Sequence, residues 1–381
     1  MITIDNNPTS GSTVQDALWH VCSSDNSGST DMKFVFDVWV GGTQRIRVKK
    51  VPEPSNGKAY FDAGPIVRNY MTYEWFEPLT VAYVAQPNDS GEISIAYQLR
   101  VGEEVSGVTT TNLASGTTTA YNYTAPLFKR RQISLADKLN KWFTNRPDYA
   151  NTDLGQNIYI PFYTNTTLTL KCSTYDWGNN LIATASGTPE AISHGFVQMN
   201  IGSEAIAAAL AITIDDNVKY YDVWFNSFDK VRVYIKCNEK YTPISVHFVN
   251  RWGMWDSQMF GLVSKLTMET TRKDFTQRDY RFNSINVDYM SASNRYYESK
   301  TNYHQKSDWT YKLTADALND DEWVWMADLL SSPQMLMEID GNFYPVTLKT
   351  SNYEYSKYEN NRLRPLELEF EMNQSRLSHL R

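Results

Sequence analysis

Cysteine is scarce in this sequence, and the few cysteines present form no recognisable pattern. The chain has three, Cys22, Cys172 and Cys237, an odd number without a Cys-x-x-Cys pair. This spacing argues against a disulfide framework and against a cysteine-based zinc site. The five histidines are isolated as well, with no second ligand at helical or strand spacing. We therefore expect buried reduced thiols, no bound metal and synthesis in the cytoplasm.

Long apolar runs and export features are also missing. No window of the sequence approaches the roughly 20 apolar residues that cross a bilayer as a helix. The first ten residues, MITIDNNPTS, contain neither a positively charged region nor an apolar core. We expect no classical export signal and no membrane partner.

The chain lacks an excess of positive charge. It has 36 Lys and Arg against 43 Asp and Glu, a net charge of −7 and a pI near 5.4. This balance argues against a surface that wraps DNA or binds anionic membranes, because both need concentrated positive charge. We interpret the local cluster at Lys129, Arg130 and Arg131 as a solvated face or a domain linker.

No catalytic constellation is visible. Ser193 beside His194, and Ser245 near His247, could be offered as nucleophile and base, but no Gly-x-Ser-x-Gly elbow or oxyanion-hole motif accompanies them. The carboxylates of residues 320–322 could be offered as a glycosidase pair, yet their place at a helix start explains them fully. We predict that the protein is not an enzyme and needs no cofactor.

Alternating apolar residues dominate what is present. The chain has 381 residues, of which 41% are hydrophobic and 14% aromatic, enough for two or three packed domains. Residues 32–50 give the clearest pattern, with alternating Phe and Val on one side of Gly41-Gly42 and Ile46 and Val48 on the other. This pattern predicts a β-hairpin and, with similar runs elsewhere, a mainly β fold.

The second part of the chain repeats the plan of the first. Three features recur at a nearly constant spacing: a glycine turn, an extended stretch that runs into a helix, and an alternating apolar run. They are residues 41–42, 61–71 and 93–97 in the first copy and 178–180, 196–210 and 231–235 in the second. The spacing predicts two tandem β-sandwich-like domains, residues 1–130 and 131–257.

Two segments of these domains have distinct compositions. Residues 134–143 predict a helix at the start of the second domain, with Ser134 as its N-cap. Residues 106–119 are almost entirely Ser, Gly, Thr, Ala and Val. We interpret them as a mobile loop, with ordering against a neighbouring subunit as the alternative.

Residues 258–381 follow a different plan and predict an α+β module. Strands are expected at residues 265–274, 280–289, 301–312, 338–348, 353–357 and 366–372. Asn319 caps one helix, whose stripe of Trp323, Met326, Ala327 and Leu330 has the spacing of a single helix face. This sheet-plus-helix arrangement is the expected third domain.

A short corner joins the second domain to this module. Gly253 lies between Trp252 and Trp255 after an alternating β run, which is typical of a tight turn whose large side chains pack on neighbouring elements. We predict that both tryptophans clamp a domain interface and that Asn250 and Asp256 fix the corner through backbone hydrogen bonds. The candidate structural or interface residues are therefore Asn250, Trp252, Gly253, Trp255 and Asp256 of this corner, together with Trp323, Met326 and Leu330 of the helix.

The order of these motifs resembles that of a known protein group. The run Asn-Arg-Trp-Gly-Met-Trp-Asp at residues 250–256, the Phe-Asp-Ala-Gly-Pro stretch from Phe61, the helix and the final β run at residues 366–373 are similar to tail-tip and tail-hub (distal-tail-like) structural proteins of tailed bacteriophages, notably phages of Bacteroidetes hosts, including the crAss-like group. None of these motifs is catalytic. The resemblance covers parts of all three expected domains.

The resemblance implies a non-enzymatic virion protein made in the host cytoplasm. Such a protein forms a homo-oligomeric ring in the tail hub, neck or tip, docks other tail or neck proteins and surrounds the DNA channel without binding DNA specifically. The tandem sandwiches would form the outer support and the α+β module the ring wall. The acidic net charge is consistent with loose contact to passing DNA.

The aromatic content leaves an alternative open. The chain has 11 Trp and 25 Tyr, and both residue types anchor sugar platforms as well as protein interfaces. A carbohydrate-binding or receptor-binding β-sandwich, similar to an adhesin, should expose coplanar aromatic rings on one face. A ring subunit should bury its aromatics between copies.

Overall fold

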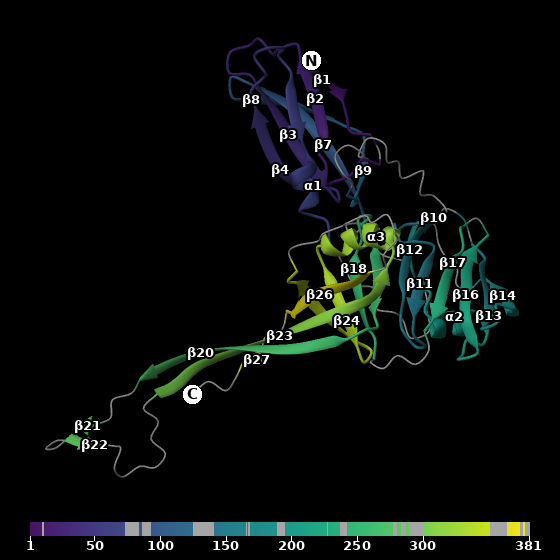
Figure 1. Ribbon diagram of the computed structural model, residues 1–381. Helices are drawn as coiled ribbons and strands as arrows, with labels where there is room; N and C mark the ends of the chain where they lie inside the picture. Colours follow the sequence, from purple (N-terminus) through teal and green to yellow (C-terminus); the bar gives the residue numbers. More distant parts are fainter. Residues whose placement is uncertain are drawn as a thin grey trace. The chain divides into compact units, whose positions relative to one another are not determined.

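The chain is mainly β, as the sequence predicts, with several antiparallel sheets. A computed structural model describes residues 1–9, 11–72, 84–85, 93–124, 141–164, 166, 168–188, 195–226, 228–236, 242–276, 280–282, 287–289, 300–350, 364–373 and 376–377 (Figure 1). The chain divides into two compact units. Unit 1 comprises residues 1–238, 247–258 and 324–333, and unit 2 comprises residues 239–246, 259–323 and 334–381. The bounds of the three expected domains stay a prediction.

The first part of unit 1 is built from residues 2–68 and 94–121 and contains two sheets. One has the order β1 (Ile2–Asn6), β2 (Trp19–Ser24), β5 (Ala59–Asp62), followed by helix α1 (Gly64–Arg68). The other has the order β4 (Thr43–Lys50), β3 (Lys33–Val40), β7 (Ser94–Val105), β8 (Val108–Ala114), with β9 (Thr118–Tyr121) also paired to β7. Side chains of both sheets meet in one core, where the Phe36 and Phe61 rings stack with centroids 4.7 Å apart.

The expected mobile loop at residues 106–119 is wrong, because this segment forms β8 and β9. Ser106 and Gly107 both have positive φ, 52° and 82°, as a tight two-residue hairpin turn requires. Thr109 and Thr110 then lie opposite Glu104 and Glu103 of β7. Composition misled the prediction, because β-branched threonines suit a paired strand as well as a loop.

The second part of unit 1 is built from residues 141–235 together with residues 84–85, and it also contains two sheets. One has the order β11 (Tyr149–Thr152), β17 (Val231–Ile235), β16 (Val218–Phe225), β13 (Leu170–Asp176), β14 (Leu181–Gly187). The other has the order β10 (Lys141–Trp142), β12 (Tyr159–Thr164), β15 (Gly195–Asn200), β6 (Val84–Ala85), and helix α2 (Ser203–Leu210) follows β15. A single core contains buried apolar residues of both sheets.

The helix expected at residues 134–143 is wrong at its end. Residues 134–140, like the basic cluster at 129–131, lie outside the described residues, but Lys141 and Trp142 form strand β10 opposite Tyr163 and Phe162. The Trp142 ring meets Phe228 edge to face at 5.1 Å, and its Nε1 donates to the Asp229 carbonyl at 2.8 Å. Burial of this large ring in the core therefore decides the local structure.

The two parts of unit 1 share a pairing pattern that corrects one of the predicted correspondences. In each part a hairpin, β3–β4 or β13–β14, pairs through its first strand with a later strand, β7 or β16. The counterpart of β7 is therefore β16. The expected match of residues 93–97 with 231–235, which lie in β17, is wrong, because spacing alone cannot tell which strands are neighbours.

In each part of unit 1, a side-chain oxygen at the end of a strand accepts two backbone hydrogen bonds and so holds the turn that leads into the next helix. Asp62 Oδ1 accepts hydrogen bonds from the backbone N–H of Leu18 and Gly64, both at 2.8 Å. Asn200 Oδ1 does the same for Ile158, at 3.2 Å, and for Gly202, at 2.9 Å.

Close approach of the backbone requires glycine at both corners. A Cβ would lie 2.6 Å from the Asp16 carbonyl oxygen at Gly64 and 2.3 Å from that of Gln156 at Gly202. Each glycine follows its acceptor by two residues, and each acceptor ends the strand before a helix.

Unit 2 contains a sheet with the strand order β24 (Met335–Ile339), β25 (Asn342–Leu348), β26 (Arg364–Met372), β23 (Lys300–Leu318), β20 (Ser264–Thr276), and β27 (Arg376–Leu377) also pairs with β23. The predicted Asp340-Gly341 turn joins β24 and β25, with φ of 51° and 74°. Strands β21 (Tyr280–Phe282) and β22 (Val287–Tyr289) pair with each other. The strand expected at residues 353–357 lies outside the described residues.

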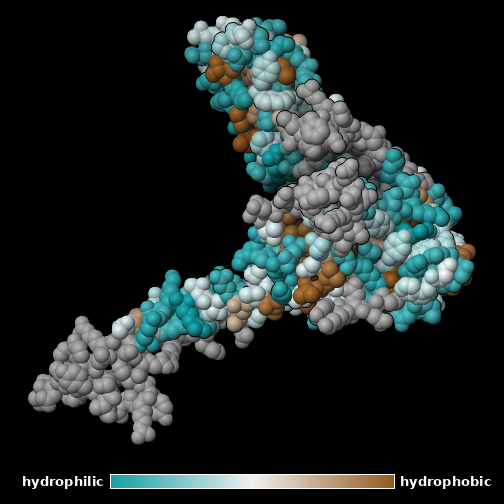
Figure 2. Space-filling model, in the orientation of Figure 1, coloured by the Kyte–Doolittle hydropathy of each residue, from teal (hydrophilic) through white to brown (hydrophobic). Residues whose placement is uncertain are grey.

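Strands β20 and β23 form a long two-stranded ribbon. They pair from Ser264 opposite Leu313 to Thr276 opposite Lys300. The ribbon extends beyond β26 in Figure 1, and its visible surface in Figure 2 is largely teal and white. Three further elements, β18 (Ile244–Val249), β19 (Trp255–Phe260) and helix α3 (Asp320–Leu330), contain residues of both units.

Candidate functional site

The corner at residues 250–256 is a turn held by one asparagine. Asn250 donates its backbone N–H to the Met254 carbonyl at 2.7 Å and accepts from the Gly253 N–H at 3.0 Å. Its side-chain Oδ1 accepts from the N–H groups of Trp252, at 2.9 Å, and Met254, at 3.2 Å. The prediction that Asn250 fixes the corner through backbone groups is confirmed.

Gly253 is required at this corner for two reasons. Its φ is +82°, a conformation that residues with a Cβ rarely adopt. A Cβ would also lie 2.3 Å from the carbonyl oxygen of Asn122. The turn therefore lies directly against the chain that follows β9, and Thr124 extends this contact by donating its N–H to the Arg251 carbonyl at 2.6 Å.

Both tryptophans of the corner are buried. Trp252 is 5% exposed and lies within 5.7 Å of the Tyr123 ring and 5.1 Å of the Phe143 ring, measured between centroids. Trp255 is 2% exposed, and the Gln198 side chain pairs with its backbone in both directions, at 3.1 Å and 2.8 Å. These contacts make both residues part of the packing within unit 1. The expected clamp of a domain interface stays a prediction.

Asp256 acts differently from the prediction, because it holds side-chain donors instead of backbone groups. It is fully buried, and its Oδ2 accepts from Thr144 Oγ1 at 2.5 Å, Trp325 Nε1 at 3.0 Å and Asn250 Nδ2 at 3.2 Å. No hydrogen bond from a described residue reaches Oδ1. Burial raises the pKa of Asp256 to about 6, against the opposing effect of these donors and of the Arg146 charge.

A second buried carboxylate, Asp328 of α3, reinforces the same region. Its Oδ1 accepts from Arg251 Nε at 2.7 Å, and its Oδ2 accepts from Asn145 Nδ2 at 3.3 Å. The Arg146 guanidinium lies over the Trp325 ring, 4.8 Å from the centroid. Charged and aromatic groups from three chain segments, 144–146, 250–256 and 325–328, are thus bound to one another.

Helix α3 begins as predicted but turns a different face inward. Asn319 Oδ1 accepts from the Glu322 N–H and Glu322 Oε2 accepts from the Asn319 N–H, both at 2.9 Å, which is a capping box. Of the predicted stripe, Met326 is buried, whereas Trp323, Ala327 and Leu330 are only partly buried. The buried residues of the helix are Glu322, Trp325, Met326, Asp328 and Leu329.

The sequence did not indicate several residues of this site: Thr144, Asn145, Arg146, Gln198, Trp325 and Asp328. The only local signal came from Trp323 and Trp325, which are two positions apart in one helix. Residues at this spacing point to opposite sides of a helix, so both could not lie on the predicted face. Thr144 and Gln198 lie 112 and 57 residues from their partners. Nothing in the neighbouring sequence indicates such distant contacts.

Of the two serine–histidine pairs considered above, the structure describes Ser245 and His247, and both side chains are buried. His247 Nδ1 lies 2.7 Å from Ser257 Oγ, but both residues are buried, at 0% and 2% exposure. His20 is buried too, and burial lowers its pKa to about 4. Cys22 and Cys172 are buried free thiols, as predicted, and burial raises the pKa of each to about 12, whereas Cys237 and His194 lie outside the described residues.

The described residues offer neither a metal site nor a membrane-spanning helix. No group of three or more His, Cys, Asp or Glu side chains there could hold a metal ion. In the same part of the chain, no helix has the length and apolar character needed to cross a membrane.

The aromatic rings on the outer face of the β13–β16–β17 sheet do not form a sugar platform, because Tyr220 is only 7% exposed and Tyr175 is only partly exposed. Tyr175 and Tyr220 stack on each other with centroids 4.7 Å apart, and Arg232 lies 4.2 Å from the Tyr220 centroid. Ring faces that cover one another are not available to a sugar ring. This observation does not favour the carbohydrate-binding alternative at this face.

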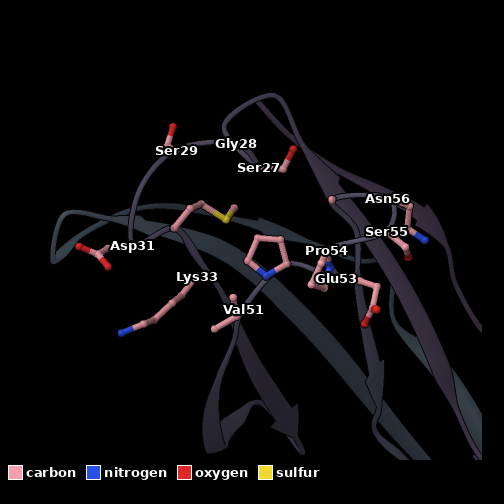
Figure 3. Close-up of a pocket in the computed structure, with 13 residues that line it drawn as sticks. Ser27, Gly28, Ser29, Asp31, Lys33, Val51, Glu53, Pro54, Ser55 and Asn56 are labelled. Carbon is pink, nitrogen blue, oxygen red and sulfur yellow. The ribbon is translucent and has the colours of Figure 1, made fainter.

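A hollow of about 560 Å³ lies between two loops of the first part of unit 1, residues 27–33 and 51–57 (Figure 3). Figure 3 shows the charged ends of Asp31, Lys33 and Glu53 spread around it. Ligand sites need a few polar groups that converge on one point. This hollow therefore offers a weak site for a small molecule.

No protein-family model matches this chain, and no curated protein matches it.

Proposed function

We propose that this chain is a structural virion protein of a tailed bacteriophage. It assembles with copies of itself into a ring in the tail hub, neck or tip, surrounds the DNA channel and docks other tail proteins. The proposal rests on the resemblance of its motifs and on the exposed ribbon of unit 2. The protein acts by assembly and not by catalysis.

The ribbon is the observation that carries the proposal. Every residue of β20 except Thr270 is exposed, and β20 ends the sheet, so one edge of its backbone is open to another strand. Its outer part, where residues 272–276 pair with residues 300–305, has no third strand among the described residues. Two strands alone are marginally stable in water. A ribbon of this length therefore gains most by packing against a neighbouring subunit.

One face of the ribbon is apolar enough for such packing. Leu266 lies opposite Tyr311 and Met268 lies opposite Trp309, and residues two apart share a face. Leu266 and Met268 are 49% and 51% exposed. Burial of these side chains between subunits would favour assembly through the hydrophobic effect.

The proposed arrangement keeps two tandem sandwiches as the outer support. The repeated corners at Asp62 and Asn200, with the same glycine two residues later, support a duplication of one domain plan. The buried clamp around Asp256 would hold the second domain rigidly. The net charge of −7 favours a channel that does not retain DNA, because like charges repel the phosphates.

The test measures the mass of the purified full chain by mass photometry and images its particles and phage virions by electron microscopy. We expect rings, and the chain within the virion tail. The double variant Leu266→Asp, Met268→Asp should disperse the rings, because it places charge in the proposed contact. Val51→Asp, at a residue 71% exposed outside the ribbon, is the matched control and should leave them intact. A stable monomer that is absent from virions would overturn the proposal.

A further inference from the structure

Strand β14 leaves one edge of its sheet open. It is the last strand of the order β11-β17-β16-β13-β14, and within the described residues only β13 pairs with it. Figure 1 shows it at the rim of that sheet. The backbone N–H and C=O groups on its outer side can therefore pair with another strand.

The composition of β14 gives that edge none of the usual protection. Its sequence, LIATASG, has no charged residue and no proline. Leu181 is 58% exposed, Ile182 is 50% exposed, and Trp177 in the adjoining turn is 50% exposed. Proteins normally block such edges with charges or proline, because they otherwise pair with other chains.

The edge strand of the first hairpin shows the contrast. Strand β4, which occupies the same place beside β3, has the sequence TQRIRVKK with four positive charges. Two copies of β4 side by side would oppose like charges. Strand β8 is also uncharged, but its exposed apolar residues, Val108 at 65% and Leu113 at 41%, are separated by three threonines and an asparagine, whereas Leu181 and Ile182 are adjacent.

The side chains of β14 suit an antiparallel contact with a second β14. Its large residues, Leu181 and Ile182, come first, and its small residues, Ser186 and Gly187, come last. Antiparallel pairing of a strand with itself places the first half against the second, so the large side chains lie beside small ones. The register shift relative to β13 lies near Leu181, and residues 183–187 pair regularly.

We propose that β14 is a self-association edge, through which two copies of this chain join their sheets across a two-fold axis. The occupant is the β14 of a second copy, because an uncharged strand meets its own copy without repulsion and because its large and small halves are complementary. This inference goes beyond the proposed ring. It predicts a pair of chains whether or not the ribbon builds a larger assembly.

One test uses charge at the edge. The full chain carrying Ile182→Lys is compared with the wild type and with Ile46→Lys, which alters an aliphatic residue 40% exposed on the β4 edge. We expect Ile182→Lys to weaken pairing by at least about tenfold in analytical ultracentrifugation, an effect of about 1.4 kcal/mol. Ile46→Lys should leave it unchanged.

A second test uses a disulfide at the centre of the contact. Thr184→Cys lies at mid-strand, and Cα atoms of opposed strand residues are close enough for a disulfide. Mild oxidation should link two Thr184→Cys chains, whereas the wild type and Ile46→Cys should stay unlinked. The wild type also controls for the native cysteines.

The outcomes separate this inference from the ring. Loss of pairing in Ile182→Lys, together with cross-linking of Thr184→Cys, supports the edge even if no ring forms. If the chains do not pair, or pair equally well in Ile182→Lys without cross-linking of Thr184→Cys, the inference is wrong, including the case in which another protein occupies the edge. Rings that persist in that case leave the ring proposal standing.

Discussion

The indole Nε1 of Trp325 donates a 3.0 Å hydrogen bond to the Oδ2 of Asp256. Both residues are buried, and the same oxygen also accepts from Thr144 and Asn250. One carboxylate oxygen thus joins helix α3, the corner at residues 250–256 and the segment before β11. The stability of this region depends on that acceptor.

Asp256→Asn should destabilise the protein. An amide presents one acceptor and a competing donor, so some of the three donors lose their partner inside the core. Each buried group left unpaired costs about 1–3 kcal/mol. Urea unfolding monitored by tryptophan fluorescence measures the change. Asp216→Asn, at an exposed position, is the control and should stay near the wild-type value.

The contribution of Asp256 should also depend on pH. Its pKa is raised from 3.8 in the unfolded reference to about 6 by burial, so the folded state binds the proton more tightly. This contribution to stability is fully present below pH 3.8 and is lost as the pH rises through about 6, by roughly 3 kcal/mol. The stability advantage of the wild type over Asp256→Asn should therefore shrink between pH 4.5 and pH 7. If the stability difference between the wild type and Asp256→Asn stayed constant over this pH range, the raised pKa of Asp256 would be contradicted.

His20 should act in the opposite direction. Its Nδ1 lies 2.9 Å from Asn7 Oδ1 and its Nε2 3.2 Å from the Tyr97 hydroxyl, and burial lowers its pKa from 6.5 to about 4. The folded state therefore favours the neutral ring, and its contribution is lost as the pH falls from 6.5 through 4. Relative to His20→Gln, the wild type should lose stability on acidification. Urea unfolding at pH 7 and pH 5 measures this, and equal pH dependence of both proteins would refute it.

Gly253→Ala should destabilise the corner more than its backbone conformation alone requires. The alanine Cβ would meet the Asn122 carbonyl oxygen in addition to adopting an unfavourable φ. Gly107→Ala separates the two effects, because Gly107 has the same φ of +82° with no atom within 4 Å. We expect about 1 kcal/mol for Gly107→Ala, from conformation alone, and a larger loss for Gly253→Ala. Equal losses in thermal unfolding would show that the close approach to Asn122 costs nothing.

Trp252→Ala and Trp255→Ala should impair stability or assembly. Removal of a buried tryptophan typically costs about 3–5 kcal/mol through lost burial and a residual cavity. Trp19→Ala, at a residue 50% exposed, is the control and should have a small effect. Thermal unfolding and particle mass are measured together with binding to a glycan array. Intact stability and assembly with lost glycan binding would replace the clamp with the carbohydrate-binding alternative.

Local chemistry determined the features that the sequence predicted well. The Gly41-Gly42 and Asp340-Gly341 turns, the capping box at Asn319 and the mainly β character all depend on a few neighbouring residues, whose conformational preferences act wherever they occur. The failed segments, residues 106–119 and 141–142, have compositions that suit more than one local structure. Pairing with distant strands selected among them.

The corner at residues 250–256 likewise combines features determined by neighbouring residues with contacts made by distant ones. By itself the sequence determined that Gly253 allows a tight turn, that Asn250 fixes it and that two large aromatic rings flank it. Only the tertiary structure decided which groups meet there: Asp256 takes side-chain donors from Thr144 and Trp325, and α3 turns Trp325 inward in place of Trp323. The physical reason is that a buried carboxylate and a buried indole N–H each need a partner, and those partners lie many residues away in the chain.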